Sequence, residues 1–251
     1  MSKRIFAAIA AIVWLIGTAN AQIPDNDFIF AEINSTASQY YYPNLMMRYE
    51  AGDALTDNEY HFLYYGYAFQ PQYKPLDANP GMDRVQAIIA RLAIDTPSVA
   101  DIDELIAAGT EAMERDPFSP KLLNIMAYAY GTSGDNVREK QYFDRLNGIL
   151  RCIERSGSGI KEKEPMHIIM FSHGLDLIAS KDWNYLKGRI ISRTVEFVPF
   201  ERPHDKVKGY YFDYSRVYWN KPDNYTFKRE RTWQFNNLKP REYKTLRKRD
   251  Y

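Results

Sequence analysis

The spacing of apolar residues changes once along this chain, at Ser156-Gly157-Ser158-Gly159. Before this segment apolar side chains recur every three or four positions, as in Met82 to Leu92, which is the period of a helix with one buried face. After it they alternate with polar side chains, as in Lys206 to Trp219, which is the period of a half-buried strand. Helices followed by strands predict an α+β fold.

Helix start signals are frequent in the expected helical region, residues 22–155. Thr56-Asp57-Asn58-Glu59 forms a capping box, in which the Thr hydroxyl and the Glu carboxylate each bond a free backbone N–H. Ser119-Pro120 combines an N-cap with a proline at the first helical position. Pro43 follows three tyrosines, and we expect it to prevent a regular element there.

The two expected helices at 121–132 and 136–155 resemble one tetratricopeptide unit. The positions that carry this resemblance are Leu123, Met126, Ala127, Tyr130, Gly134 and Phe143. We expect Gly134 at the turn and Tyr130 meeting Phe143 across the pair. Repeats of this kind need stacked neighbours, and a partial copy precedes the pair, so the sequence predicts a short helical scaffold.

The second half of the chain is expected to be a mostly antiparallel sheet that packs on the helices. We read residues 156–165 as a flexible linker and 166–238 as the β-rich region. The expected strands lie within 166–171, 189–200, 206–219 and 226–235. The tail, residues 239–251, is basic.

The first 21 residues have the pattern of a secretory signal peptide. Lys3 and Arg4 precede the apolar run Ile5 to Ile16, and Ala19-Asn20-Ala21 supplies small residues at a cleavage site. The run has 12 residues, whereas a membrane-spanning helix needs about 20. Gln22 follows the cleavage site where a lipoprotein would have cysteine. We therefore expect a periplasmic or secreted protein.

The single cysteine restricts how the fold can be stabilised, and the charge distribution restricts which partners the chain can bind. Cys152 is the single cysteine, so no intramolecular disulfide can form and a hydrophobic core must stabilise the fold. Residues 221–251 carry ten Lys or Arg against four Asp or Glu, a net charge of +6. This end is either solvated or in contact with an anionic surface. The chain lacks a nucleic-acid recognition motif, so we expect no nucleic-acid partner.

Tyrosine is unusually abundant, with 20 Tyr beside 13 Phe and 4 Trp. Many of these rings lie in proline-flanked segments, where loops can present stiff, amphipathic contact surfaces. The candidate binding residues are Tyr40, Tyr41, Tyr42, Tyr64, Tyr65, Tyr67 and Tyr73, with Trp219 and Trp233. The alternative is that the same rings pack between helices and sheet.

Two stretches resemble a known family. They are Tyr41 to Tyr49 with Tyr64 to Pro71, and Val207 to Asp213. They are similar to an uncharacterised family of secreted proteins from Gram-negative gut anaerobes, defined only as a domain of unknown function. The resemblance extends over roughly residues 26–219 and implies an envelope or extracellular location. It brings no catalytic residues with it.

Catalytic signatures are weak in this sequence. It contains no zinc-protease, phosphate-loop or dinucleotide-binding motif, and we expect neither a metal nor a cofactor. His167, His173 and Asp176 are the candidate catalytic residues of a hydrolase acting on glycan or peptide. The favoured reading is a non-catalytic exported envelope protein that binds or scaffolds a protein, peptide or glycan partner.

We predict that the exported protein begins at Gln22, with its α-amine either free or cyclised to pyroglutamate. Cleavage after Ala21 follows from the small residues that precede it. Intact mass measurement of exported material tests this prediction. A mass that still includes Lys3 and Arg4 would show that cleavage does not occur there.

Overall fold

The computed structural model describes residues 21–93 and 97–219 and confirms an α+β fold. Most of the predicted signal peptide, the expected strand at 226–235, Trp233 and the basic tail lie outside the described residues. The elements are α2 Asn26–Asn34, α3 Tyr42–Ala51, α4 Asp57–Gly66, η1 Tyr67–Phe69, α5 Pro80–Leu92, α6 Val99–Met113, α7 Pro120–Ser133, α8 Asn136–Arg155, β1 Met166–His167, α9 Phe171–Ala179, β2 Arg189–Ile190, β3 Val195–His204, β4 Val207–Asp213 and η2 Ser215–Tyr218.

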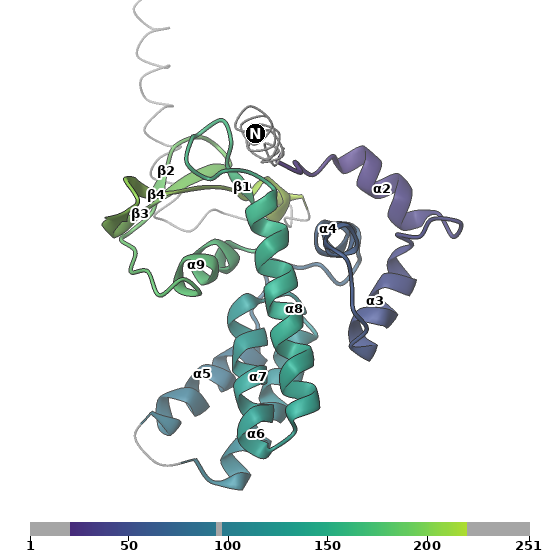
Figure 1. Cartoon of the computed structure of the whole chain (residues 1–251), viewed down its shortest axis with the longest axis vertical. Helices are drawn as coiled ribbons and strands as arrows, with labels where there is room; N and C mark the ends of the chain where they lie inside the picture. Colours follow the sequence, from purple (N-terminus) through teal and green to yellow (C-terminus); the bar gives the residue numbers. More distant parts are fainter. Residues whose placement is uncertain (1–20, 94–96, 220–251) are drawn as a thin grey trace, which may run out of the picture.

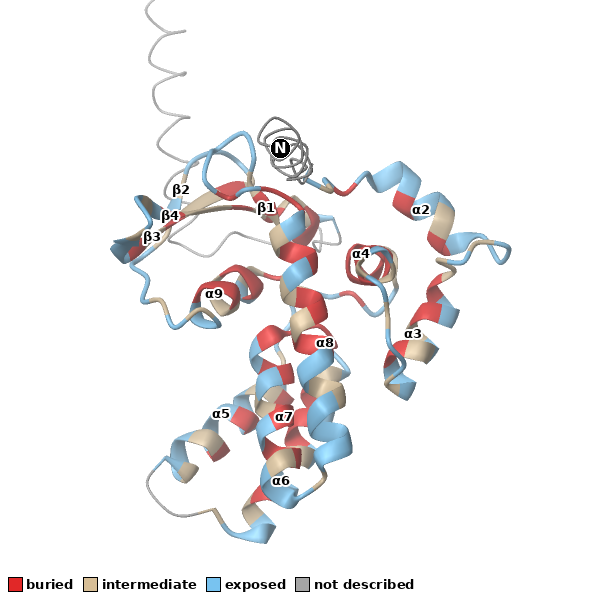
Figure 2. Ribbon diagram, in the orientation of Figure 1, coloured by how far each residue is buried: buried red, intermediate tan, exposed pale blue. Residues whose placement is uncertain are grey.

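The helices α5 to α8 form a column, and the other elements form a head at one end of it (Figure 1). Consecutive helices of the column pack on one another, and α8 runs from the far end of the column into the head (Figure 1). Two clusters of buried apolar side chains correspond to these parts, and Tyr142 and Met113 touch both. Burial marks the helix faces that meet a neighbour, and it also includes Tyr60 to Gly66 of α4 and part of the sheet (Figure 2).

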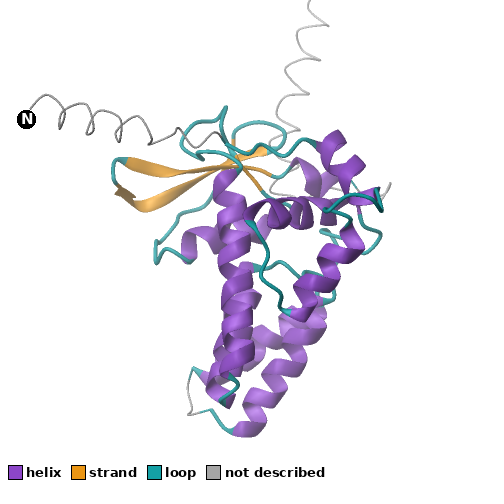
Figure 3. Ribbon diagram, turned by 45° about the vertical axis from the view of Figure 1, so that its right-hand side comes forward, coloured by secondary structure: helices purple, strands orange, loops and turns teal. Residues whose placement is uncertain are grey.

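The sheet has the strand order β1-β4-β3-β2. β3 pairs with β2 and β4 in antiparallel fashion, whereas β1 is parallel to β4, so the predicted mostly antiparallel sheet is confirmed. The β3–β4 hairpin extends beyond the helices (Figure 3). Asp205 and Lys206 at its tip both have positive φ, which is the backbone of a tight hairpin turn.

The helix start signals of the sequence are confirmed. Both hydrogen bonds of the Thr56–Glu59 capping box are present, and the Ser119 hydroxyl accepts the Leu122 N–H. Gly134 ends α7 at a φ of 87°, which glycine adopts without a steric penalty. The expectation for Pro43 is wrong, because α3 begins at Tyr42 and Pro43 lies in its first turn. An N–H has no intrahelical acceptor there, so proline is tolerated.

The predicted contact between Tyr130 and Phe143 is also wrong. Tyr130 stacks on Tyr142, with ring centroids 5.3 Å apart, while Phe143 is 54% exposed. The helix α8 packs on α4 as well as on α7. Its buried face is therefore rotated toward Tyr142 and the buried Arg145, whose guanidinium lies over the Tyr49 ring.

A helix was missed in the apolar run that begins at Met166. Only Met166 and His167 form a strand, and Phe171 starts the nine-residue helix α9. Gly174 lies inside α9. A Cβ at this position would lie 3.0 Å from the Phe212 ring, so glycine lets the helix lie close against β4.

The segment Ser156 to Gly159 is a packed turn and not a flexible break. Ser156 is fully buried, and its hydroxyl donates to the Ile153 carbonyl and accepts the His167 N–H, at 2.6 and 2.7 Å. The Tyr211 N–H donates to the Gly159 carbonyl. This turn therefore connects the end of α8 rigidly to the sheet.

We predict that Gly157→Ala destabilises the fold by about 1–3 kcal/mol, the usual cost of overpacking a close contact. The added Cβ would lie 2.0 Å from the Pro165 carbonyl oxygen, which is backbone and cannot swing away. Urea unfolding measures the change. The control is Gly131→Ala, because the nearest atoms to its Cβ would be the end of the flexible Glu139 side chain and alanine favours a helix by about 1 kcal/mol. Equal effects of the two substitutions would contradict the prediction.

Candidate functional site

Five of the predicted binding tyrosines belong to the core. Tyr42, Tyr64, Tyr65, Tyr67 and Tyr73 are each at most 8% exposed. The hydroxyls of Tyr65, Tyr67 and Tyr73 donate to backbone carbonyls at 2.6–3.2 Å. A buried tyrosine needs such a partner for its polar tip. These five rings hold the loops on the helices, so the prediction that they form an exposed surface is wrong.

The remaining predicted rings are placed differently. Tyr40 and Tyr41 are half-buried, and Tyr40 stacks on Phe62 with ring centroids 3.9 Å apart. Trp219 is 38% exposed and contacts Phe69. Trp233 lies outside the described residues. The structure therefore does not gather these rings into one surface.

His173 lies on α9 at the centre of a buried hydrogen-bond chain. Its Nδ1 is 2.8 Å from the Tyr64 hydroxyl, and its Nε2 is 3.0 Å from Asp116 Oδ2. The Tyr64 hydroxyl also accepts the Ile169 N–H. Both ring nitrogens are thus engaged and the side chain is 0% exposed, so His173 has no free nitrogen for a substrate.

The structure brings His173 and Asp176 onto adjacent turns of α9 but keeps His167 apart from them. His167 is on β1, and burial lowers the pKa of its imidazole to about 4. Its Nδ1 is buried and has no hydrogen-bond partner among the described residues. His167 does not line the hollows beside Asp176. The three candidate catalytic side chains therefore do not converge.

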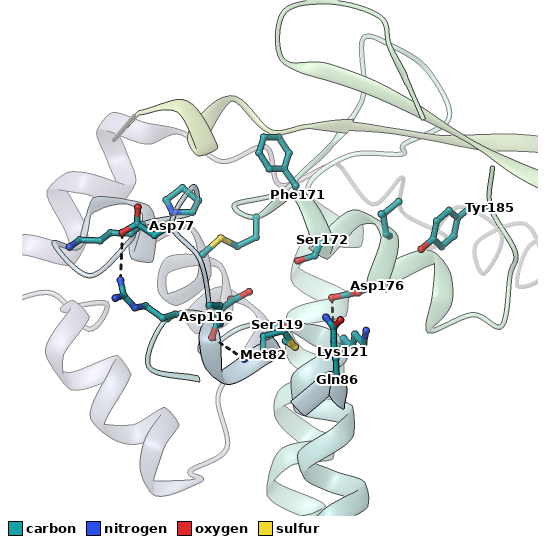
Figure 4. Close-up of a pocket in the computed structure, with 16 residues that line it drawn as sticks. Asp77, Met82, Gln86, Asp116, Ser119, Lys121, Phe171, Ser172, Asp176 and Tyr185 are labelled. Atoms are coloured by element: carbon teal, nitrogen blue, oxygen red, sulfur yellow. Dashed lines mark hydrogen bonds and ion pairs between the residues drawn. The ribbon is translucent and has the colours of Figure 1, made fainter. Parts of the chain in front are cut away.

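Two adjoining hollows lie where the column meets α9. The first, of about 450 Å³, is bounded by the loop before α5, the α6–α7 connection and α9 (Figure 4). The second, of about 620 Å³, lies between α7, α8 and the end of α9. Lys121, Asp176 and Tyr185 line both hollows. We call the two together the α7–α9 groove.

Asp176 stands at the junction of the two hollows. Its carboxylate accepts the Lys121 N–H at the start of α7, at 3.4 Å (Figure 4). Burial, with a smaller contribution from the nearby Asp116, raises the pKa of Asp176 to about 6 against the opposing effects of His173 and the Lys121 N–H. Asp116 also lines the groove, and its Oδ1 is buried with no hydrogen-bond partner among the described residues. The groove thus holds carboxylate oxygens that water solvates poorly.

An apolar stripe from α8 lines the second hollow. Phe143, Leu146 and Leu150 follow one another at helical spacing on one face of α8. Phe143 and Tyr185 are exposed, at 54% and 41%. The sequence analysis missed the groove because it assigned Phe143 to the core and gave Tyr185 no role. Among the described residues, no cluster of His, Cys, Asp or Glu is arranged to hold a metal ion.

Comparison with known proteins identifies the family. The family model of DUF4919, a domain of unknown function, matches residues 27–222, which is most of the chain, so the chain belongs to this family. This confirms the expected membership of an uncharacterised domain family. No curated protein and no solved structure matches the chain. Within residues 21–93 and 97–219, no helix has the length and apolar character that crossing a membrane requires.

We predict that Asp176→Asn stabilises the protein by about 1–3 kcal/mol at about pH 7 and has little effect at about pH 4. The folded carboxyl keeps its proton up to about pH 6, whereas the unfolded one loses it near 3.8. Stability of the parent therefore falls as pH rises between these values, because the folded state binds more protons there. Asparagine cannot ionise and still accepts the Lys121 N–H.

Urea unfolding of both proteins at the two pH values measures the difference. Asp103→Asn, at an exposed position of α6, is the matched control because it removes the same charge from a solvated site. An effect of Asp176→Asn that does not change with pH would contradict the prediction.

Proposed function

We propose that this DUF4919 member is a non-catalytic exported protein of the cell envelope that binds a peptide segment of a partner protein in the α7–α9 groove. Export rests on the signal-peptide pattern of the first 21 residues. Binding rests above all on one observation. Asp176 lines both hollows of the groove. Because its pKa is raised to about 6, ionisation of this carboxyl at neutral pH lowers the stability of the folded protein.

A partner that brings a positive charge would offset that cost. A lysine or arginine side chain placed beside Asp176 would pair with its carboxylate in a charge-assisted hydrogen bond. Charge pairs of this kind gain strength in a poorly solvated site. A residue that lowers stability and lies in a groove is typical of a binding site that trades stability for function.

The apolar stripe favours a peptide over a glycan. Phe143 is exposed and Leu150 half-buried beside the buried Leu146, so apolar side chains of a peptide segment can contact this part of α8. Exposed apolar side chains with a polar rim often mark interaction sites. Lys121, Asn124 and Asp182 supply that rim. Stacked helical hairpins also present extended surfaces of this type.

No observation favours the alternative of a glycan- or peptide-acting hydrolase. His167 does not line the groove, and both nitrogens of His173 are hydrogen-bonded inside the core. A general base must reach the proton that it removes. Asp176 therefore has no histidine among the candidate residues that could act with it in general acid–base catalysis.

The binding proposal is tested with the chain that begins at Gln22 and a phage-displayed library of random peptides. We expect enriched peptides to contain Lys or Arg next to apolar residues. We expect Asp176→Asn and Tyr185→Ala each to weaken binding of a selected peptide at least about tenfold, since a buried charge pair or anchor contributes more than about 1.4 kcal/mol. Tyr128→Ala is the matched control, because this exposed ring on α7 lies outside the groove.

Loss of binding by Asp176→Asn cannot be attributed to unfolding if that variant is more stable than its parent at neutral pH. Selected peptides without basic residues, or unchanged binding to Asp176→Asn, would contradict the role of the carboxylate. A library without enriched sequences, together with binding on a glycan array, would overturn the peptide proposal.

A further inference from the structure

The first described residues form an arm that is fixed at both of its ends. The Gln22 backbone N–H donates to the Arg155 carbonyl at 2.7 Å, and the Gln22 side-chain amide donates to Asn58 Oδ1 at 3.3 Å. Further along, the buried Arg216 donates to the Pro24 carbonyl at 3.1 Å and to Asn26 Oδ1 at 2.5 Å. Gln22 is also the residue that follows the predicted cleavage site.

The acceptor of the Gln22 N–H is the end of a long helix. Arg155 is the last residue of α8, which has 20 residues. The final carbonyls of a helix lack intrahelical partners and carry the negative end of its dipole. A positively charged donor is therefore favoured at this point over a neutral one.

The neighbouring arginine side chains pair with Asp57, which leaves the Arg155 carbonyl available to a positively charged donor. The Arg155 guanidinium is paired with Asp57 at 2.6 Å, and Arg151 pairs with the same carboxylate at 3.1 Å. These ion pairs lower the pKa of Asp57 against the opposing effect of its partial burial. The positive charge of Arg155 is thus directed toward Asp57.

We propose that cleavage after Ala21 leaves the new α-amine of Gln22 bound to the Arg155 carbonyl as a charged cap on α8, and that this contact protects Gln22 from cyclisation to pyroglutamate. The inference does not depend on the function of the α7–α9 groove. In cyclisation the α-amine nitrogen attacks Cδ of its own side chain, an N–Cδ bond forms, the Cδ–Nε2 bond breaks, and Nε2 leaves as ammonia with the amine proton. In the structure the Gln22 backbone nitrogen and side-chain amide bond different partners, Arg155 and Asn58; if the α-amine keeps the first contact, both contacts must open before cyclisation.

The test uses a chain prepared to begin at Gln22, so that its outcome is independent of whether export cleaves the protein there. Intact mass measurement follows the loss of ammonia at neutral pH, beside a synthetic peptide of residues 22–30. We expect the folded chain to cyclise at least about threefold more slowly than the peptide, which corresponds to the usual strength of charge contacts at a helix end. Cyclisation at the peptide's rate would overturn the proposal.

Two variants separate docking from general folding. Asn58→Ala frees the side-chain amide and should bring the rate closer to that of the peptide, whereas Asn44→Ala, on the exposed face of α3, should leave it unchanged. A second readout is the melting temperature of a chain lengthened by an acetylated Ala21, which replaces the charged amine by an amide. We expect it to melt lower than the chain that begins at Gln22, and equal melting would overturn the charged cap.

Discussion

The hydrogen-bond chain from the Ile169 N–H through Tyr64 and His173 to Asp116 joins three parts of the molecule. Tyr64 belongs to α4, His173 to α9, and Asp116 to the connection between α6 and α7. The Tyr64 hydroxyl, both His173 ring nitrogens and Asp116 Oδ2 each bond a neighbour in this chain, so removing one side chain would leave another polar atom without a partner. The chain fixes α9 against the start of α7, and the α7–α9 groove exists because these two helices are held in that relation.

Local signals in the sequence predicted the local structure well. Capping residues such as Thr56 and Ser119 bond backbone groups within one turn of the helix, so the residues next to them in sequence are enough to identify them. The change in apolar period at Ser156 located the end of α8 and the start of the part that holds the sheet, although the missed helix α9 lies in that part too. Signals that depend on distant segments were misread. Phe143 was assigned to the buried face because α8 was considered with α7 alone, while α4 determines the rest of that face.

The candidate site illustrates the same limit. Buried and exposed tyrosines look alike in a sequence, because what keeps Tyr73 inside is the Ile169 carbonyl, 96 positions further along the chain. Asp176 was named beforehand, but as a partner of two histidines. Its environment depends on the Lys121 N–H and on the burial that the column provides. A groove between elements so far apart in sequence leaves no periodic pattern along the chain.

Contacts in the column join residues that are close in sequence, whereas contacts in the head join distant ones. This difference determines the expected order of folding. The column is built from consecutive helices, so its contacts close short loops and can form quickly. The head joins its ends across nearly the whole described chain, as when Arg216 bonds Pro24, 192 positions away. Closing such a loop costs more entropy. We therefore expect the column to form first and to serve as the template on which the head assembles once Arg216 has been synthesised.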